Sequence, residues 1–152
     1  MTERAPAEAP PTAPSAALIP AYVMAAPKPQ DVIDLFRGEW VCALPPTARV
    51  TAGTYPAFKD PRITWGIAQL GGAGGRTVLE LGPLEAGHSY LLERLGAAEI
   101  VGIEANTRAY LRCLVVKEIL GLGRARFLCG EFVSYLRTSD RRFDLAVASG
   151  VL

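Results

Sequence analysis

The chain has 152 residues, enough for about one domain, and a formal net charge of +1. Half of its residues are hydrophobic and 20% are charged, so it can bury a proper core. The near-neutral charge argues against binding a long nucleic acid through charge alone, and no apolar run reaches the roughly 20 residues of a membrane-spanning helix. The single histidine, His88, leaves little for a histidine metal site or a hydrolytic triad, so we predict no metal site.

The first 75 residues are expected to form a flexible tail and a helical cap segment. Residues 1–28 are rich in Ala and Pro, and repeated prolines prevent a stable helix. Within 29–75, a short helix is predicted to end at Gly38, and a second to run from Asp60 as N-cap to Gly71. Their expected apolar faces are Val32, Ile33, Leu35 and Phe36 in the first, and Ile63, Ile67 and Leu70 in the second. The second helix is expected to cover one side of a sheet, with a lid over a ligand pocket as the alternative.

From residue 76 the pattern alternates between strands and helices. Strands are predicted at 76–82, 98–104, 125–130 and 142–152, with helices at 88–96, 107–123 and 131–138. The strands are nearly continuous apolar runs, which is expected when helices cover both faces of a parallel α/β sheet. In the helix at 107–123 we expect a core face of Leu111, Val115, Ile119 and Leu122, with Arg108 and Arg112 off it.

The loop after the first predicted strand, "ELGPLEAGH", is almost a dinucleotide-binding loop. Gly82 and Gly87 hold the outer positions of G-x-G-x-x-G, but Leu84 replaces the middle glycine that lets a pyrophosphate approach the backbone. Pro83 lacks an N–H donor, and Glu85 adds a negative charge where a phosphate would lie. The loop is therefore predicted to bind something other than a phosphate, which disfavours a nicotinamide dehydrogenase.

Three acids lie at or directly after the carboxyl ends of the first three predicted strands, where the ligands of doubly wound sheets bind. Glu80 is expected to face the ligand cleft and to suit a cation. Glu104 can accept the two hydroxyls of a ribose, and Glu131 or its neighbours can receive an adenine amino group with Phe132 beside the ring. S-adenosylmethionine combines a cation, a ribose and an adenine without phosphates.

Each of these assignments has a structural rival. Glu104 could be a solvated acid at a strand end, Glu131 a first-turn acid favoured by the helix dipole, and Asn106 a helix N-cap rather than a ligand contact. Gly87 could serve helix packing only. We interpret His88 as a polar cap or a neighbour of the loop rather than a catalytic base.

The segments "VLELGPLEAGHS", "IVGIEAN", "LCGEF" and "FDLAVASGVL" resemble, in order and spacing, the motifs of class I S-adenosylmethionine-dependent methyltransferases. The resemblance covers residues 76–152 and departs from the usual glycine pattern at Leu84 and Ala86. It implies a Rossmann-like, doubly wound, mostly parallel sheet in three α/β/α layers, with family strand order 3-2-1-4-5-7-6. The residues it assigns to the cofactor are Glu80, Gly82 and Gly87 at the methionine end, Glu104 with Ala105 at the ribose, Gly130, Glu131 and Phe132 at the adenine, and Ala148, Ser149 and Gly150 beneath the sulfonium.

On this resemblance residues 76–152 are expected to be a partial cofactor-binding domain of a chain truncated after its fourth strand. The expected activity is methyl transfer to an unidentified acceptor, a small molecule or sugar rather than nucleic acid, with no catalytic residue assigned. The alternative is a non-catalytic interaction module, and the open sheet edge offers a surface for dimer formation. Three cysteines without a CxxC pair fit a reducing, cytoplasmic location better than a disulfide framework.

Overall fold

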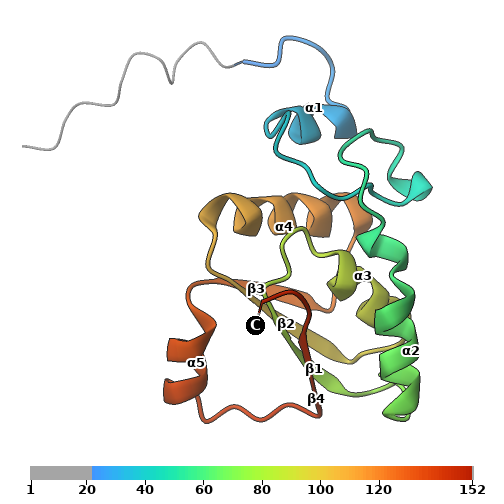
Figure 1. The fold of residues 1–152 in the computed structure, drawn as a ribbon. Coiled ribbons are helices and arrows are strands. Elements are labelled where there is room, and N and C mark those ends of the chain that lie inside the picture. The colour runs from blue at the N-terminus through green and yellow to red at the C-terminus, as the bar shows by residue number, and fades with distance from the viewer. Residues whose placement is uncertain (1–21, 152) are drawn as a thin grey trace, which may run out of the picture.

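The computed structural model describes residues 22–151, so most of the predicted tail at 1–28 lies outside the described residues. Two helices, α1 (Pro29–Asp34) and α2 (Pro61–Gln69), and two 3-10 turns, η2 (Pro46–Ala48) and η3 (Ala57–Lys59), precede the sheet. The elements that follow are β1 (Thr77–Leu81), α3 (Gly87–Arg94), β2 (Glu99–Glu104), α4 (Thr107–Leu120), β3 (Ala125–Cys129), α5 (Phe132–Thr138) and β4 (Leu145–Ala148) (Figure 1). In the described part of the chain, no helix has the length and apolar character needed to cross a membrane.

The four strands form one parallel sheet in the order β3-β2-β1-β4. This confirms the predicted α/β class and the first part of the predicted strand order. The register pairs Glu80 with Gly102, and Glu104 with Cys129, so the carboxyl ends of the strands share one edge. β2 and β3 lie on one side of β1, whereas β4 lies on the other side, so the strand order reverses next to β1. A ligand site is expected beside that switch in strand order.

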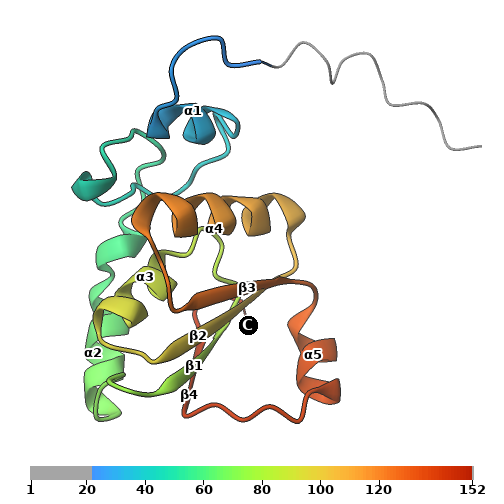
Figure 2. The same ribbon diagram turned by 180° about the vertical axis from the view of Figure 1, so that it is seen from behind.

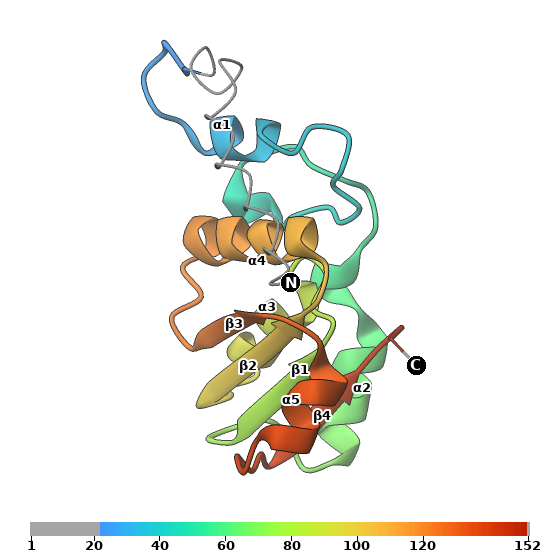
Figure 3. The same cartoon turned by 90° about the vertical axis from the view of Figure 1, so that its left-hand side faces the viewer.

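Helices cover the two faces of the sheet unequally (Figures 1 and 3). On one face α3 and α4 bury Val78 and Ile100 in a large core that α2 joins through Ile63 and Ile67. On the other face α5 is the one helix of the described residues that packs on the sheet, and the buried residues there are Leu79, Leu81, Val101 and Ile103. Because this cover is thin, the edge strands β3 and β4 alternate buried and exposed residues, so the expectation of two covered faces is wrong for them.

The first part of the cap segment, with α1 and η2, lies against α4 on the side away from the sheet, whereas α2 packs beside α3; Figure 2 shows this arrangement from behind. The cap predicted at Asp60 is confirmed, and Asn106 is a helix cap as one of its two interpretations had it, whereas the first helix ends at Asp34 and not at the predicted Gly38. The Asp60 carboxylate accepts a hydrogen bond from the Arg62 N–H at 2.9 Å, and the Asn106 side chain accepts from the N–H groups of Arg108 and Ala109. Gly121 ends α4 with φ +63°, a conformation that favours glycine.

The predicted core face of the helix at 107–123 is wrong at Leu111 and confirmed at Leu122, which is buried, while Val115 and Ile119 pack partly buried against the core. The residues buried against the sheet are Ala109, Cys113 and Val116, whereas Leu111 is exposed and Arg112 is buried. Small side chains let this helix approach the sheet closely, and Arg112 is tolerated inside because it meets a buried acid. The larger apolar residues of α4 instead line an apolar hollow shared with α1.

The cap helices also differ from their predicted faces. In the first, Ile33 and Phe36 are buried but Val32 and Leu35 are exposed, since both border the apolar hollow shared with α4. In α2 the predicted Leu70 is exposed, because the helix ends at Gln69 and Leu70 lies in the turn that follows.

The corrected face of α4 predicts which side chains stabilise the fold. Val116→Ala removes fully buried methyl groups and is expected to lower the free energy of unfolding by about 2 kcal/mol. Leu111→Ala, on the exposed side, is expected to cost less than about 1 kcal/mol. Urea unfolding of both variants checks this, and a larger loss for Leu111→Ala would contradict the assignment of the face.

Candidate functional site

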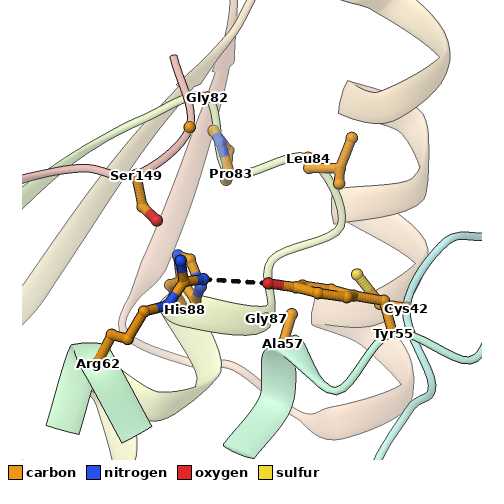
Figure 4. A pocket seen from close by; sticks show the side chains of 11 residues that line it. Cys42, Tyr55, Ala57, Arg62, Gly82, Pro83, Leu84, Gly87, His88 and Ser149 are labelled. Carbon is orange, nitrogen blue, oxygen red and sulfur yellow. Dashed lines mark hydrogen bonds between the residues drawn. The ribbon is translucent and has the colours of Figure 1, made fainter. Parts of the chain in front are cut away.

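A cavity of about 240 Å³ opens at the carboxyl end of β1, between the sheet edge and the cap segment (Figure 4). Three stretches of chain form its wall: the cap segment, the loop into α3, and the residues after β4. The side chains and glycines that line it are Cys42, Tyr55, Ala57 and Arg62 from the first, Gly82, Pro83, Leu84, Gly87 and His88 from the second, and Ser149 and Gly150 from the third.

The loop from β1 into α3 is tightly turned. Gly82 has φ +66°, and a Cβ atom there would lie 2.3 Å from Val151 Cγ1, so only glycine fits. Gly87 has no room either, because its Cβ would lie 2.6 Å from Ala57 Cβ where η3 packs on α3. Leu84 and Ala86 adopt left-handed conformations, φ +54° and +58°, that cost a residue with a side chain about 1–2 kcal/mol each.

Glu85 holds this strained loop to the cap segment. Its fully buried carboxylate accepts hydrogen bonds from the N–H groups of Val41 (3.0 Å) and Cys42 (2.7 Å), and its Oε1 lies 3.0 Å from Arg112 Nε. The prediction that Glu85 would place its charge in a phosphate position is therefore wrong, because the side chain points away from the cavity into the core. Its partners lie far away in sequence, which is why the sequence gives no sign of them.

Glu104 fastens the same loop from the sheet side. Its Oε2 accepts the Leu84 N–H and its Oε1 accepts the Asn106 N–H, both at 2.9 Å, and the side chain is buried. The interpretation of Glu104 as a solvated strand-end acid is therefore wrong. A carboxylate has about four acceptor positions, so two remain for hydroxyl groups of a ligand.

Glu80 was expected to face the ligand cleft. In the structure it is buried behind the loop and is not part of the cavity wall. Its Oε2 accepts a hydrogen bond from Ser89 Oγ, while its buried Oε1 has no hydrogen-bond partner and lies 3.8 Å from His88 Nδ1. Burial raises the pKa of this carboxyl to about 7, with a smaller contribution from the negative charge of Glu104 and opposition from the Ser89 bond. A nearby cation would satisfy the free oxygen and lower this pKa.

The residues assigned to the adenine lie at the carboxyl end of β3, outside the wall of the cavity. Glu131 is exposed, and its carboxylate caps α5 by accepting from the N–H groups of Val133 and Ser134, both at 2.7 Å, which lower its pKa. The contacts of the Glu131 carboxylate thus agree with the alternative interpretation of Glu131 as an acid at the start of a helix. Phe132 packs partly buried on the sheet, and the Gly130 N–H donates to the Glu104 carbonyl at 2.9 Å. Ala105, next to Glu104, is exposed.

A group of polar side chains in the cavity wall was not predicted as functional. The Asp60 Oδ2 lies 3.3 Å from His88 Nε2 and 2.6 Å from Arg62 Nη2. Arg62 in turn donates to the Tyr55 hydroxyl at 3.0 Å, and Figure 4 shows this bond near His88. The Arg62 bonds are the main cause that lowers the pKa of Asp60 to about 2, whereas burial lowers the pKa of His88. Asp60 was recognised only as a helix cap, and no pattern marks Tyr55 or Arg62. Within residues 22–151, no cluster of three or more potential metal ligands occurs.

Comparisons with known proteins identify the fold. No family model matches the chain, and no curated protein matches its sequence. The N-terminal domain of EvdMO1, solved with S-adenosylhomocysteine and D-fucose, is 23% identical with a TM-score of 0.63 over 80% of this chain and 52% of that one. A Klebsiella pneumoniae protein proposed to be an O-methyltransferase is 17% identical with a TM-score of 0.52 over 86% of this chain and 56% of that one. The chain has the class I S-adenosylmethionine-dependent methyltransferase fold.

This chain thus spans about half the length of these structural neighbours with the methyltransferase fold. In the described part, the sheet contains the β3-β2-β1-β4 portion of the class I order, and the cavity lies at its switch point. The sequence identities are low, so the likeness concerns the fold.

The raised pKa of Glu80 predicts a pH dependence of stability. A carboxyl whose folded pKa is raised contributes most below its unfolded pKa near 4.5, and the contribution is lost as the pH rises through about 7. The difference in unfolding free energy between the wild type and Glu80→Gln should therefore shift in favour of Gln between pH 5 and pH 8, by about 1.4 kcal/mol per unit of pKa difference. Urea unfolding at several pH values measures this, and a constant difference would show that Glu80 titrates normally.

The contacts of Glu85 predict a large loss of stability when it is removed. Glu85→Ala leaves the Arg112 guanidinium and two backbone N–H groups buried with fewer partners, and is expected to cost about 3 kcal/mol or more. Glu118→Ala, an exposed acid on α4, serves as the control and should change stability by less than about 0.5 kcal/mol. Equal effects in thermal unfolding would refute the anchoring role of Glu85.

Proposed function

We propose that the chain binds S-adenosylmethionine and transfers its methyl group to a small molecule or sugar. The observation that carries this proposal is Glu104. Its carboxylate ends β2, fastens the loop after β1 through the Leu84 N–H, and keeps free acceptor positions beside the switch in strand order. An acid at this place suits the hydroxyls of a ribose, and the methyltransferase fold makes S-adenosylmethionine the nucleoside of choice.

The remaining residues fit the other parts of that cofactor. Gly82 and Gly87 line the base of the cavity, and Ser149 borders it after β4, where we place the methionine end. The buried Oε1 of Glu80, 3.8 Å from the cavity residue His88, has no hydrogen-bond partner within residues 22–151, and a nearby cationic group would satisfy it. We place the ribose at Glu104 and Ala105, and the adenine near Gly130, Glu131 and Phe132, with Glu131 contributing through its backbone because its carboxylate caps α5.

Bound S-adenosylmethionine supplies a methyl group that is already activated by its positive sulfur. The chain then has to align an acceptor with that group and to exclude water. The cap segment serves both needs, since Tyr55 and Arg62 close the cavity on the side opposite Gly82.

The volume of the cavity and the net charge of the chain support a small acceptor. The cavity volume of about 240 Å³ suits a compact molecule, and the net charge of +1 offers no field for a long nucleic acid. The EvdMO1 domain was solved in the presence of S-adenosylhomocysteine and a sugar, D-fucose. The unpaired Cys42, Cys113 and Cys129 support our proposal of a cytoplasmic location.

Calorimetric titration with S-adenosylhomocysteine tests the proposed function. The wild-type chain should bind, and Glu104→Gln should weaken binding by about tenfold or more, because a charged acceptor of two hydroxyls is lost. Glu131→Ala is the matched control: its carboxylate is engaged at the helix cap, so affinity should change by less than about threefold while stability falls by about 1 kcal/mol.

Glu104 also supports the loop through the Leu84 N–H, so its substitution can weaken binding by unfolding the chain. The unfolding temperature of each variant distinguishes this effect from the loss of a direct contact with the ligand. If the folded wild-type chain binds no S-adenosylhomocysteine, the proposal is wrong. A folded Glu104→Gln variant with unchanged affinity would remove Glu104 from the site.

A further inference from the structure

His88 occupies a position in the cavity that the binding of a cofactor does not explain. It is the only histidine of the chain, it begins the first turn of α3, and it lines the cavity together with Gly82 and Ser149. Its side chain is only 14% exposed. A buried imidazole beside a ligand cavity is costly unless its nitrogens have partners.

Asp60 is the charged group nearest to one of these nitrogens, Nε2, which has no hydrogen-bond partner within residues 22–151. Its Oδ2 lies 3.3 Å from His88 Nε2, and the carboxylate is held in place by the backbone N–H and the side chain of Arg62. A carboxylate only accepts hydrogen bonds when ionised, so it favours the tautomer with the proton on Nε2. His88 Nδ1 then carries a lone pair.

Nothing that the structure describes takes up this lone pair. The nearest acid to Nδ1 is Glu80, whose Oε1 lies 3.8 Å away, beyond hydrogen-bonding distance. The charged groups that face the imidazole are Asp60 and Glu80, with Arg62 behind Asp60. Burial outweighs the attraction of Asp60, and together with the charge of Arg62 it lowers the His88 pKa, so the ring is neutral at pH 7 and above.

We propose that Asp60 and His88 form the proton-accepting pair of this site, and that its acceptor is a hydroxyl group. This inference rests on the proposed methyl transfer and adds the class of acceptor to it. The acceptor oxygen forms a bond to the methyl carbon as the carbon–sulfur bond breaks, and the electron pair of that bond stays on sulfur. The hydroxyl proton goes to His88 Nδ1, and Asp60 stabilises the positive charge that the ring gains.

The hydroxyl class follows from what the pair can do. A hydroxyl keeps its proton at neutral pH and is a weak nucleophile, so a neutral base in contact with it assists the transfer. The Tyr55 hydroxyl and Ser149 are also in the cavity wall and can orient a polar acceptor of this kind.

Nuclear magnetic resonance of the imidazole nitrogens tests the pair directly, because only one histidine contributes a signal. In the full chain at pH 7.5, with and without saturating S-adenosylhomocysteine, we expect a neutral ring with the proton on Nε2 and a titration midpoint below the usual 6.5. Asp60→Asn should lower the midpoint further and weaken the preference for the Nε2–H tautomer. Asp34→Asn, which removes an exposed acid on α1, should leave both unchanged.

Calorimetry on the same samples separates the two proposals. A wild-type chain that binds S-adenosylhomocysteine but has a charged ring at pH 7.5, or a proton on Nδ1, overturns the proton-accepting pair alone. A chain that fails to bind overturns the methyltransferase proposal and this inference with it. His88→Gln should bind S-adenosylhomocysteine within about threefold of the wild type, because His88 acts on the acceptor; a loss above about tenfold would make His88 a cofactor ligand and overturn the inference.

Discussion

The buried carboxylate of Glu85 is the contact on which the rest of the site depends. It joins three parts of the chain that are distant in sequence: the loop after β1, the backbone at Val41 and Cys42, and Arg112 in α4. Arg112 extends the connection to Glu39 of the cap segment at 3.1 Å. A buried charge of this kind is tolerated only with full pairing, so the cap segment and the loop hold each other in place.

This anchoring explains how the loop can lack two glycines. Leu84 and Ala86 adopt the left-handed conformation at a cost that glycine would avoid, and the bonds of Glu85 and Glu104 offset it. Glycine remains where space demands it, at Gly82 against Val151 and at Gly87 against Ala57. The loop therefore owes its shape to carboxylates that bind backbone N–H groups, which also makes the cap segment a part of the cavity wall.

The order of strands and helices could be predicted because local signals were strong, such as the caps at Asp60 and Asn106 and the apolar strands. The buried face of α4 could not, because apolar residues occur all around it and the small ones face the sheet. The inward orientation of Glu85 depends on partners more than 25 residues away, and a carboxylate in a loop is ordinarily exposed. Tyr55 and Arg62 could not be predicted as site residues either, because only the packing of the cap segment brings them to the cavity.

Hydrogen–deuterium exchange on the intact chain tests most directly whether this carboxylate-held loop is a cofactor site. With saturating S-adenosylhomocysteine, the account predicts slower exchange at residues 82–88 and 104–106, where the loop and Glu104 lie, and little change in the exposed turn after α2. Unchanged exchange in both of those regions, under conditions where calorimetry detects binding, would place the ligand elsewhere and contradict the account.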